Sequence, residues 1–216
     1  MKKNNNLYAN YIKRYLDVAL ALLILLMFGW LYLILMVLVR VKLGSPIFFR
    51  QKRVGKNGRI FKIWKFRSMY QDAEARKKEL MDKNEMDGLM FKMEADPRII
   101  GSGPDGTRHG IGWFIRKTSI DEFPQFLNVL MGDMSLVGTR PPTLDEWRNY
   151  DPHHRARMAI KPGLTGLWQV SGRSNITDFE EVIRLDLEYI NTWSVLGDIG
   201  IILKTVKVLF TGDGAK

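Results

Sequence analysis

The feature that most limits the fold is a run of 22 residues, 18–39, that carries no charged side chain. As an α-helix, this run would be about 33 Å long at about 1.5 Å per residue, which is enough to cross a hydrocarbon core about 30 Å thick. A cleaved signal peptide fits poorly, because Arg40 and Lys42 follow the run where a small-residue cleavage site is needed. A helix buried in a soluble core is the alternative, but such helices are rarely apolar on every face for about six turns. The run therefore predicts a membrane-embedded helix.

Positive charge is concentrated around this helix. Residues 1–60 contain eleven Lys and Arg residues and a single acid, Asp17, so the net charge of +10 lies entirely in this part of the chain. A nucleic-acid-binding protein usually spreads its basic residues over one folded face, whereas basic residues that bracket an apolar run suit an anionic membrane surface. The pattern predicts contact with membrane lipid and no nucleic-acid partner.

The basic residues lie on both sides of the apolar run, and the cytoplasmic flanks of membrane helices are the ones enriched in Lys and Arg. A straight span puts its flanks on opposite sides, whereas a helix that enters the bilayer, bends and returns keeps both flanks on one side. Gly29, in the middle of the run, is the predicted bend, because glycine weakens a helix. We expect a re-entrant helix, with a single straight span as the alternative.

Residues 43–69 predict two short strands around the turn "GKNG". Four cations alternate with apolar residues here, namely Arg53, Lys62, Lys65 and Arg67. They indicate either an ordinary polar strand face or an anion-binding face close to the membrane.

The rest of the chain predicts mostly helices. A charged helix is expected over residues 70–93, another from Ser119 to about Met131, a third opened by Pro142 and Thr143, an amphipathic one over 177–193 and a strongly apolar one over 196–210. The last is expected either to lie in the membrane interface or to pack in the core. Loops are expected over residues 95–117 and 160–176.

Two absences narrow the possible functions. The chain has no cysteine, which excludes disulfides, thiolate metal sites and cysteine nucleophiles. Gly101, Gly103 and Gly106 match G-x-G-x-x-G, but Pro104 lies inside the motif and no helix is expected after it, so we reject a dinucleotide site.

The expected fold class is α+β and mostly helical. Residues 1–42 would form the N-terminal basic segment and membrane helix, and residues 43–216 a second domain with amphipathic interfacial helices.

The adjacent acids Asp121 and Glu122 allow two interpretations. Ser119 and Glu122 have the spacing of a capping box, which would account for Glu122 as a helix cap. Arg116 precedes the acids and Arg140 follows them, however, and acids close to several cations suit phosphate chemistry with a divalent metal. An aspartate can also attack phosphorus directly.

Four stretches resemble the bacterial polyprenyl-phosphate sugar-1-phosphate transferases, the monotopic phosphoglycosyl transferases. They are "KRYLDVALALLILL", "GSPIFFRQKRVGKNGRIFKIWKFRSM", "TSIDEFPQFLNVLMGDMSLVGTRPP" and "KPGLTGLWQVSGR". They occur in the family's order and cover nearly the whole chain from Lys13. The resemblance implies transfer of a sugar 1-phosphate from a UDP-sugar to a membrane polyprenyl phosphate such as undecaprenyl phosphate, with release of UMP. It implies the first membrane step of capsule or exopolysaccharide synthesis, at the cytoplasmic face of the bacterial inner membrane, with residues 43–216 as the cytoplasmic catalytic domain.

The resemblance also implies roles for residues. Asp121 would be the nucleophile that carries the phosphosugar, and Glu122 would help to coordinate Mg²⁺. Contacts to the substrate phosphates are expected from a further set, comprising Lys62, Lys65, Arg67, Arg116, Arg140, Gln169 and Arg173. A homo-oligomer is left open, and the residues do not identify the sugar.

Two positions depart from the family's pattern. Gly29 and Trp30 stand where the family often has Ser-Pro in its membrane helix, and Thr139 stands where many relatives have proline. Larger relatives carry an additional membrane bundle and a regulatory domain, so this chain is expected to be the minimal catalytic form. The rival hypothesis is a membrane-anchored, non-catalytic adaptor of polysaccharide assembly, in which the acids only cap a helix.

Overall fold

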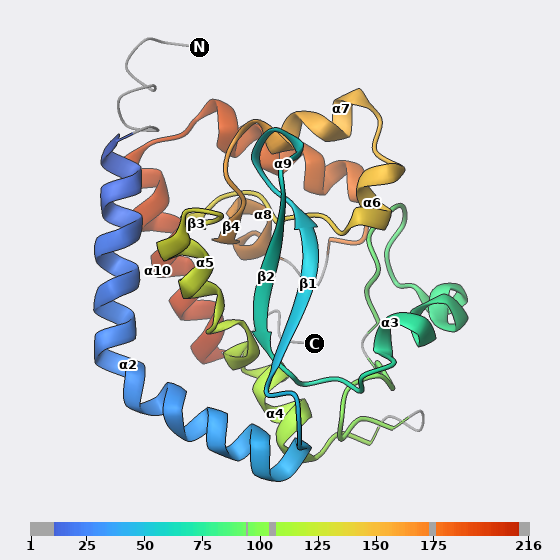
Figure 1. Ribbon diagram of the computed structural model, residues 1–216. Helices are drawn as coiled ribbons and strands as arrows, with labels where there is room; N and C mark the ends of the chain where they lie inside the picture. Colours follow the sequence, from blue (N-terminus) through green and yellow to red (C-terminus); the bar gives the residue numbers. More distant parts are fainter. Residues whose placement is uncertain (1–10, 94, 104–106, 173–175, 212–216) are drawn as a thin grey trace.

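The computed structural model describes residues 11–93, 95–103, 107–172 and 176–211, and Figure 1 shows their arrangement. The first long helix, α2, spans Lys13–Leu43 and is long and apolar enough to cross a membrane by length and composition. Figure 1 shows that α2 consists of two stretches that meet at a marked bend. The helix predicted from residues 18–39 is confirmed, and it extends further at both ends.

The first stretch of α2 is attached to the folded body by buried polar contacts. Lys13 Nζ lies 2.5 Å from a carboxylate oxygen of Asp198, and both side chains are nearly inaccessible to solvent. One turn along the helix, a carboxylate oxygen of Asp17 accepts a hydrogen bond of 2.9 Å from the backbone N–H of Leu136. Ala21, a further turn along, is fully buried in the core. Residues spaced by four lie on one face of a helix, so this face is fixed to the body.

The end of α2 is attached to the same body by apolar packing. Leu35 and Val39 are buried in a cluster with Phe66 and Ile115. Between the two attachments the helix is largely exposed, and Leu26 keeps 81% of its surface accessible. An exposed apolar surface of this length, held at both ends by one domain, is suited to burial in lipid.

Two antiparallel strands follow, β1 (Phe48–Val54) and β2 (Ile60–Phe66). The turn between them contains the 3-10 helix Lys56–Gly58, in which Asn57 and Gly58 have φ angles of 56° and 80°. Positive φ is the conformation that Asn and Gly adopt most readily, so "GKNG" forms the tight turn that its composition predicts. The hairpin is confirmed.

The remaining elements are mostly short helices. They are α3 (Ala73–Arg76), η3 (Lys77–Lys83), α4 (Gly110–Lys117), η4 (Ile120–Glu122), α5 (Gln125–Met131), β3 (Ser135–Val137), α6 (Leu144–Arg148), α7 (Pro152–Arg155), η5 (Ala156–Ala159), β4 (Gly163–Thr165), α8 (Leu167–Val170), α9 (Phe179–Asn191) and α10 (Val195–Thr211). The prediction of a mostly helical α+β fold with one membrane-type helix is confirmed.

The strands β3 and β4 form a short parallel pair in the centre of the fold. Their backbones approach so closely that a Cβ atom on Gly163 would lie 2.1 Å from the backbone nitrogen of Gly138. Only glycine fits there, which gives the glycine of "KPG" a packing role. The pair fixes the segment that leads into Arg140.

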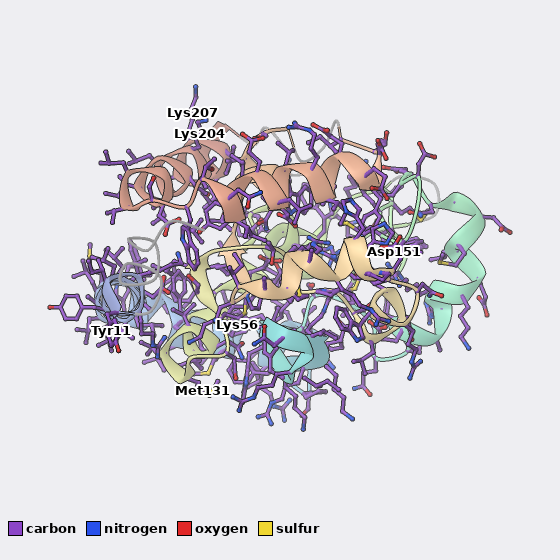
Figure 2. The ribbon with its side chains drawn as sticks, turned by 90° about the horizontal axis from the view of Figure 1, so that it is seen from above. Tyr11, Lys56, Met131, Asp151, Lys204 and Lys207 are labelled. Atoms are coloured by element: carbon purple, nitrogen blue, oxygen red, sulfur yellow. The ribbon has the colours of Figure 1, made fainter. Side chains whose placement is uncertain are left out.

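Figure 2 shows the body in layers, with the hairpin on one side and α9 and α10 on the other. The side of α10 that faces the body buries Ile201, whereas Leu196 and Leu203 on its other side are 81% and 65% exposed. Lys207 points away from the body in Figure 2. This helix was expected either to lie in the membrane interface or to pack in the core. In the structure one of its faces packs on the core, and the opposite face is apolar and exposed.

Three local predictions are wrong. Residues 70–93 form only α3 and η3 followed by irregular chain, because this charged segment has no continuous apolar stripe to pack. Residues 110–117, expected as loop, form α4, and residues 160–176, also expected as loop, contain β4 and α8. Both segments are rich in glycine, which predicts loops, but tertiary packing stabilises short helices and a short strand in them.

Candidate functional site

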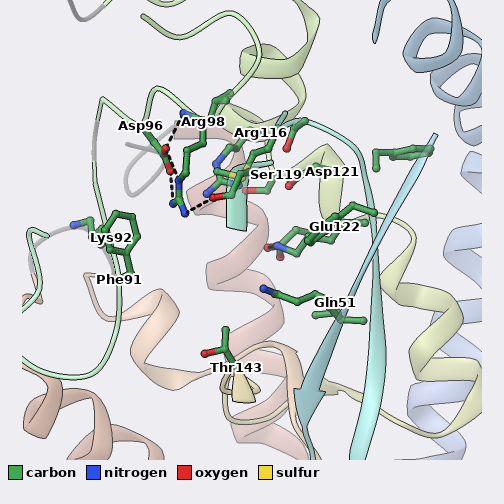
Figure 3. Close-up of a pocket in the computed structure, with 18 of the residues that line it drawn as sticks. Gln51, Phe91, Lys92, Asp96, Arg98, Arg116, Ser119, Asp121, Glu122 and Thr143 are labelled. Atoms are coloured by element: carbon green, nitrogen blue, oxygen red, sulfur yellow. Dashed lines mark hydrogen bonds and ion pairs between the residues drawn. The ribbon is translucent and has the colours of Figure 1, made fainter. Parts of the chain in front are cut away.

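A cavity of about 550 Å³ opens between the hairpin, η4, α4 and the segment before α6. This volume lies within the range of small-molecule sites, roughly 300–1,000 Å³. Figure 3 shows Asp121, Glu122, Arg116 and Ser119 gathered at one end of the cavity, with Gln51 further along it.

The acid pair lies in the cavity wall. Asp121 and Glu122 are the last two residues of η4, and Asp121 is only 3% exposed. Ser119, just before η4, adopts a left-handed conformation with φ 56°, which is uncommon for a residue with a side chain and is found mostly where the surrounding structure enforces it. The turn directs both acids towards the cavity.

The capping box at Ser119 and Glu122, one of the two interpretations of the acid pair, is not formed. Ser119 makes no side-chain cap, and η4 and α5 replace the single helix expected from Ser119 to Met131. Glu122 forms an ion pair of 2.6 Å with Lys65 of β2. The capping boxes of the described chain occur at Thr143 with Glu146 and at Asp151 with His154. The acids are therefore not needed as helix caps.

Alternation along the hairpin decides which of its cations reach the cavity. Lys65 of β2 and Arg53 of β1 lie on the cavity face, because their odd-numbered positions share one side of the sheet. Lys62 lies three positions from Lys65 and is therefore on the opposite, exposed face. The expected role of Lys62 in phosphate binding is not supported by this position.

Three other expected residues, Arg67, Arg116 and Gln169, line the cavity and differ in the contacts that their side chains make. Arg67 lines it, but its guanidinium donates to the backbone oxygens of Ser45 and Leu43, so it mainly holds the end of α2. Arg116 lines it from α4. Gln169 also lines it, and its side-chain amide donates to Leu164 O at 3.5 Å.

Arg140 also lines the cavity, from the segment before α6. Its Nη1 is 3.3 Å from a carboxylate oxygen of Glu146, whose side chain is 3% exposed. Burial would raise the pKa of Glu146, but the charges of Arg140 and Arg53, together with the hydrogen bond from the backbone N–H of Thr143 and the charge of Lys77, hold the pKa below its usual value. Arg173, expected as a further phosphate contact, lies outside the described residues.

The structure also places in the cavity residues to which the resemblance assigned no role, among them Arg53 of the possible anion-binding face. Arg53 donates to Gln51 and to the backbone oxygen of Pro141, and burial together with Arg140 lowers its pKa to about 10. The register of the hairpin was the signal that would have found it, since Arg53 shares a face with Lys65.

Arg98 and Asp96 form part of the cavity wall. The guanidinium makes two parallel hydrogen bonds to the carboxylate, of 2.8 and 2.7 Å, and it lies 4.7 Å from the centre of the Phe91 ring. Figure 3 shows this pair across the cavity from Gln51. Because the Asp96 carboxylate balances the charge of Arg98 and accepts two of its hydrogen bonds, Arg98 supports the cavity wall and is less available to a ligand.

The donor set at the acid pair fits a magnesium ion shared with a substrate. Within the described residues there is no cluster of three or more His, Asp and Glu side chains that would hold a metal alone. Mg²⁺ commonly takes one or two carboxylates and completes its shell with phosphate oxygens and water. Asp121 and Glu122 could supply these one or two carboxylate ligands.

Cations from the hairpin, α4 and the segment before α6, with two adjacent carboxylates, define a site suited to a phosphorylated ligand, in a domain whose helix α2 is long and apolar enough to cross a membrane. The sequence model of the bacterial sugar transferase family matches residues 8–212. The chain therefore belongs to this family.

Individual relatives agree with the family match. The galactosyl transferase CpsE of Streptococcus agalactiae is 56% identical over 204 residues, which are 94% of this chain and 43% of the relative. An undecaprenyl-phosphate galactose phosphotransferase of Salmonella typhimurium is 38% identical over 211 residues, 96% of this chain and 42% of the relative. The exopolysaccharide production protein ExoY of Sinorhizobium fredii is 36% identical over 207 residues, 94% of this chain and 87% of the relative. The chain thus spans less than half the length of the first two relatives.

Proposed function

We propose that this protein transfers a sugar 1-phosphate from a UDP-sugar to a polyprenyl phosphate and releases UMP. The observation that carries the proposal is the pair Asp121–Glu122 inside a cation-lined cavity, next to a helix suited to lipid. Both substrates are anionic, so cations are needed to limit their repulsion and to stabilise transferred charge. The family and the printed names of its members, which include a galactose and an N-acetylgalactosamine phosphotransferase, support the same reaction.

In this mechanism Asp121 is the nucleophile. One of its oxygens attacks the phosphorus that bears the sugar, and the bond from that phosphorus to the bridging oxygen breaks, so that its electron pair leaves with UMP. An oxygen of the lipid phosphate then attacks the same phosphorus, and the bond to Asp121 breaks. Lys65 holds Glu122 beside the reacting carboxylate. Asp121 and Glu122 would hold Mg²⁺, which would neutralise phosphate charge.

The test of this function is a panel of UDP-sugars, including UDP-galactose and UDP-N-acetylgalactosamine, assayed with undecaprenyl phosphate and magnesium. We expect UMP and a lipid-linked sugar diphosphate in equal amounts from at least one donor. If no donor yields UMP while the protein remains folded, the adaptor hypothesis replaces the enzyme. Chelation of magnesium in the productive assay is expected to stop both products.

We further propose that α2 is re-entrant, with both of its ends on the cytoplasmic side. A straight helix that crossed about 30 Å of hydrocarbon would carry one end away from the domain. In this structure the first turns of α2 contact Asp198 and Leu136, and its last turns pack on Phe66 and Ile115. The bend in Figure 1 is the geometry that re-entry needs.

The topology is testable because the chain has no cysteine. In cells, Lys3→Cys should be labelled from the same side of the membrane as Asp145→Cys, which reports on the exposed surface of α6. Lys3→Cys labelling from the outside, with Asp145→Cys protected, would establish a straight span.

A further inference from the structure

One buried side chain in the cavity wall has a hydrogen-bond donor without a partner. Gln125 is the first residue of α5, lines the cavity and is only 2% exposed. Among the described residues, no atom accepts a hydrogen bond from its side-chain nitrogen, Nε2. A buried polar group without a partner costs stability, so such groups are rare in native proteins and often have a role in function. The packing of the core alone therefore does not account for this amide.

The backbone places Gln125 beside the acid pair. Phe123 and Pro124, which join η4 to α5, have right-handed helical angles, so the helical backbone continues from one element into the other. Residues three and four apart on such a backbone are neighbours, with Cβ atoms about 5–6 Å apart. Gln125 is three residues after Glu122 and four after Asp121, and all three line the cavity. A group bound to the Asp121 carboxylate is therefore within reach of the Gln125 amide.

A neutral donor at this position suits phosphoryl transfer. A lysine or arginine here would form ion pairs with the adjacent carboxylates, as Lys65 does with Glu122, and would reduce the negative charge of the nucleophile. An amide N–H carries no net charge, so it can contact a phosphate oxygen and leave the charge of Asp121 in place. During transfer, negative charge is spread over the oxygens that stay on the phosphorus, and a donor fixed against one of them lowers the barrier.

We propose that Gln125 is a catalytic residue, whose side-chain N–H donates to an oxygen of the transferred phosphoryl group. The contact is made while the phosphosugar passes to Asp121 and again while it leaves Asp121 for the lipid phosphate, and no bond to Gln125 forms or breaks. The proposal rests on the proposed function and deepens it by naming a residue that stabilises the transferred group.

The first test is the effect of Gln125→Met on stability. Methionine has a similar length and volume but no donor. Because the amide has no partner in the free protein, its removal should raise the Tm, measured in detergent, by about 2–4 °C. Gln71→Met is the matched control, since the Gln71 amide is exposed and already donates to the backbone oxygen of Ser45 at 3.0 Å, so its removal should not raise the Tm. A lower Tm for Gln125→Met would mean that the amide supports the fold, and would overturn the proposal.

The second test is kinetic. Transfer by Gln125→Met should fall by about 100-fold, in kcat rather than in the KM for the donor, because the contact is strongest in the transition state. UMP release with donor alone and discharge of the phosphosugar to polyprenyl phosphate should both slow. Gln125→Ala should show the same loss of rate, and Gln71→Met should stay within about twofold of the wild type. The factor should be the same for every UDP-sugar that the wild type accepts, because the contacted oxygen belongs to the phosphate.

The outcomes separate this proposal from the proposed function. If the wild type transfers sugar phosphate and Gln125→Met or Gln125→Ala does so at the same rate, the function stands and Gln125 has no catalytic contact. If the loss of rate differs from one UDP-sugar to another, the amide contacts the sugar, and its assignment to the phosphoryl group is wrong. A wild-type protein without any transfer removes the proposed function and this inference with it.

Discussion

Asp121→Asn is expected to lower sugar-phosphate transfer by at least about 10³-fold, because an amide cannot replace a carboxylate as the nucleophile at phosphorus. The side chain is buried at 3% exposure and asparagine has nearly the same shape, so the fold should survive. The measurement is the rate of UMP release, together with intact-protein mass after exposure of the enzyme to donor alone. The wild type should gain the mass of one sugar phosphate, and the variant should not.

Asp145→Asn is the matched control for this change. Asp145 lies on the surface of α6 with its side chain 74% exposed, so the same substitution there should leave the rate within about twofold. Normal transfer by Asp121→Asn, or transfer by the wild type through no protein-bound intermediate, would remove Asp121 from its proposed role. Glu122→Gln offers an intermediate case, since it loses the ion pair with Lys65 but keeps the nucleophile.

The elements that sequence reasoning found are those whose signal is local. The long uncharged run, the "GKNG" turn and the apolar periodicity before Trp193 each lie within one stretch of chain, and they correspond to α2, the hairpin and α9. The parallel pair β3–β4 was missed because each strand has three residues and its partner is distant along the chain. Such pairs are created by tertiary contact and leave almost no pattern in the sequence.

The candidate site shows the same division. The acid pair stood out because its neighbours in the sequence are charged, but the structure was needed to show that Glu122 contacts Lys65 and caps no helix. The sequence alone could have separated Lys62 from Lys65, because positions three apart on a strand face opposite sides of the sheet. Arg53 was one of four cations on a possible anion-binding face, and the register of β1 against β2 was needed to place it on the same face as Lys65.

Asp186→Asn is expected to lower the free energy of unfolding by about 3–5 kcal/mol, because it leaves a charged arginine buried without its anionic partner. Asp186 of α9 forms an ion pair with Arg157, and the two side chains are 1% and 0% exposed. Arg157 also donates to the hydroxyl of Tyr150 at 3.0 Å, and its backbone oxygen accepts from Thr139, next to Arg140. The pair therefore supports the segment that carries a cavity arginine.

The control lies on the same helix. Glu181 pairs with Arg184 at 2.7 Å on the exposed surface of α9, and breaking this solvent-screened pair with Glu181→Gln should leave the free energy of unfolding almost unchanged. The measurement is denaturant unfolding of both variants in detergent, followed by the KM for the donor of whatever remains folded. Equal stability losses in the two variants would mean that burial adds nothing to this pair. A large loss of stability in Asp186→Asn alone, together with a raised KM for the donor, would show that the buried ion pair positions the cavity segment through the hydrogen bond between Thr139 and Arg157.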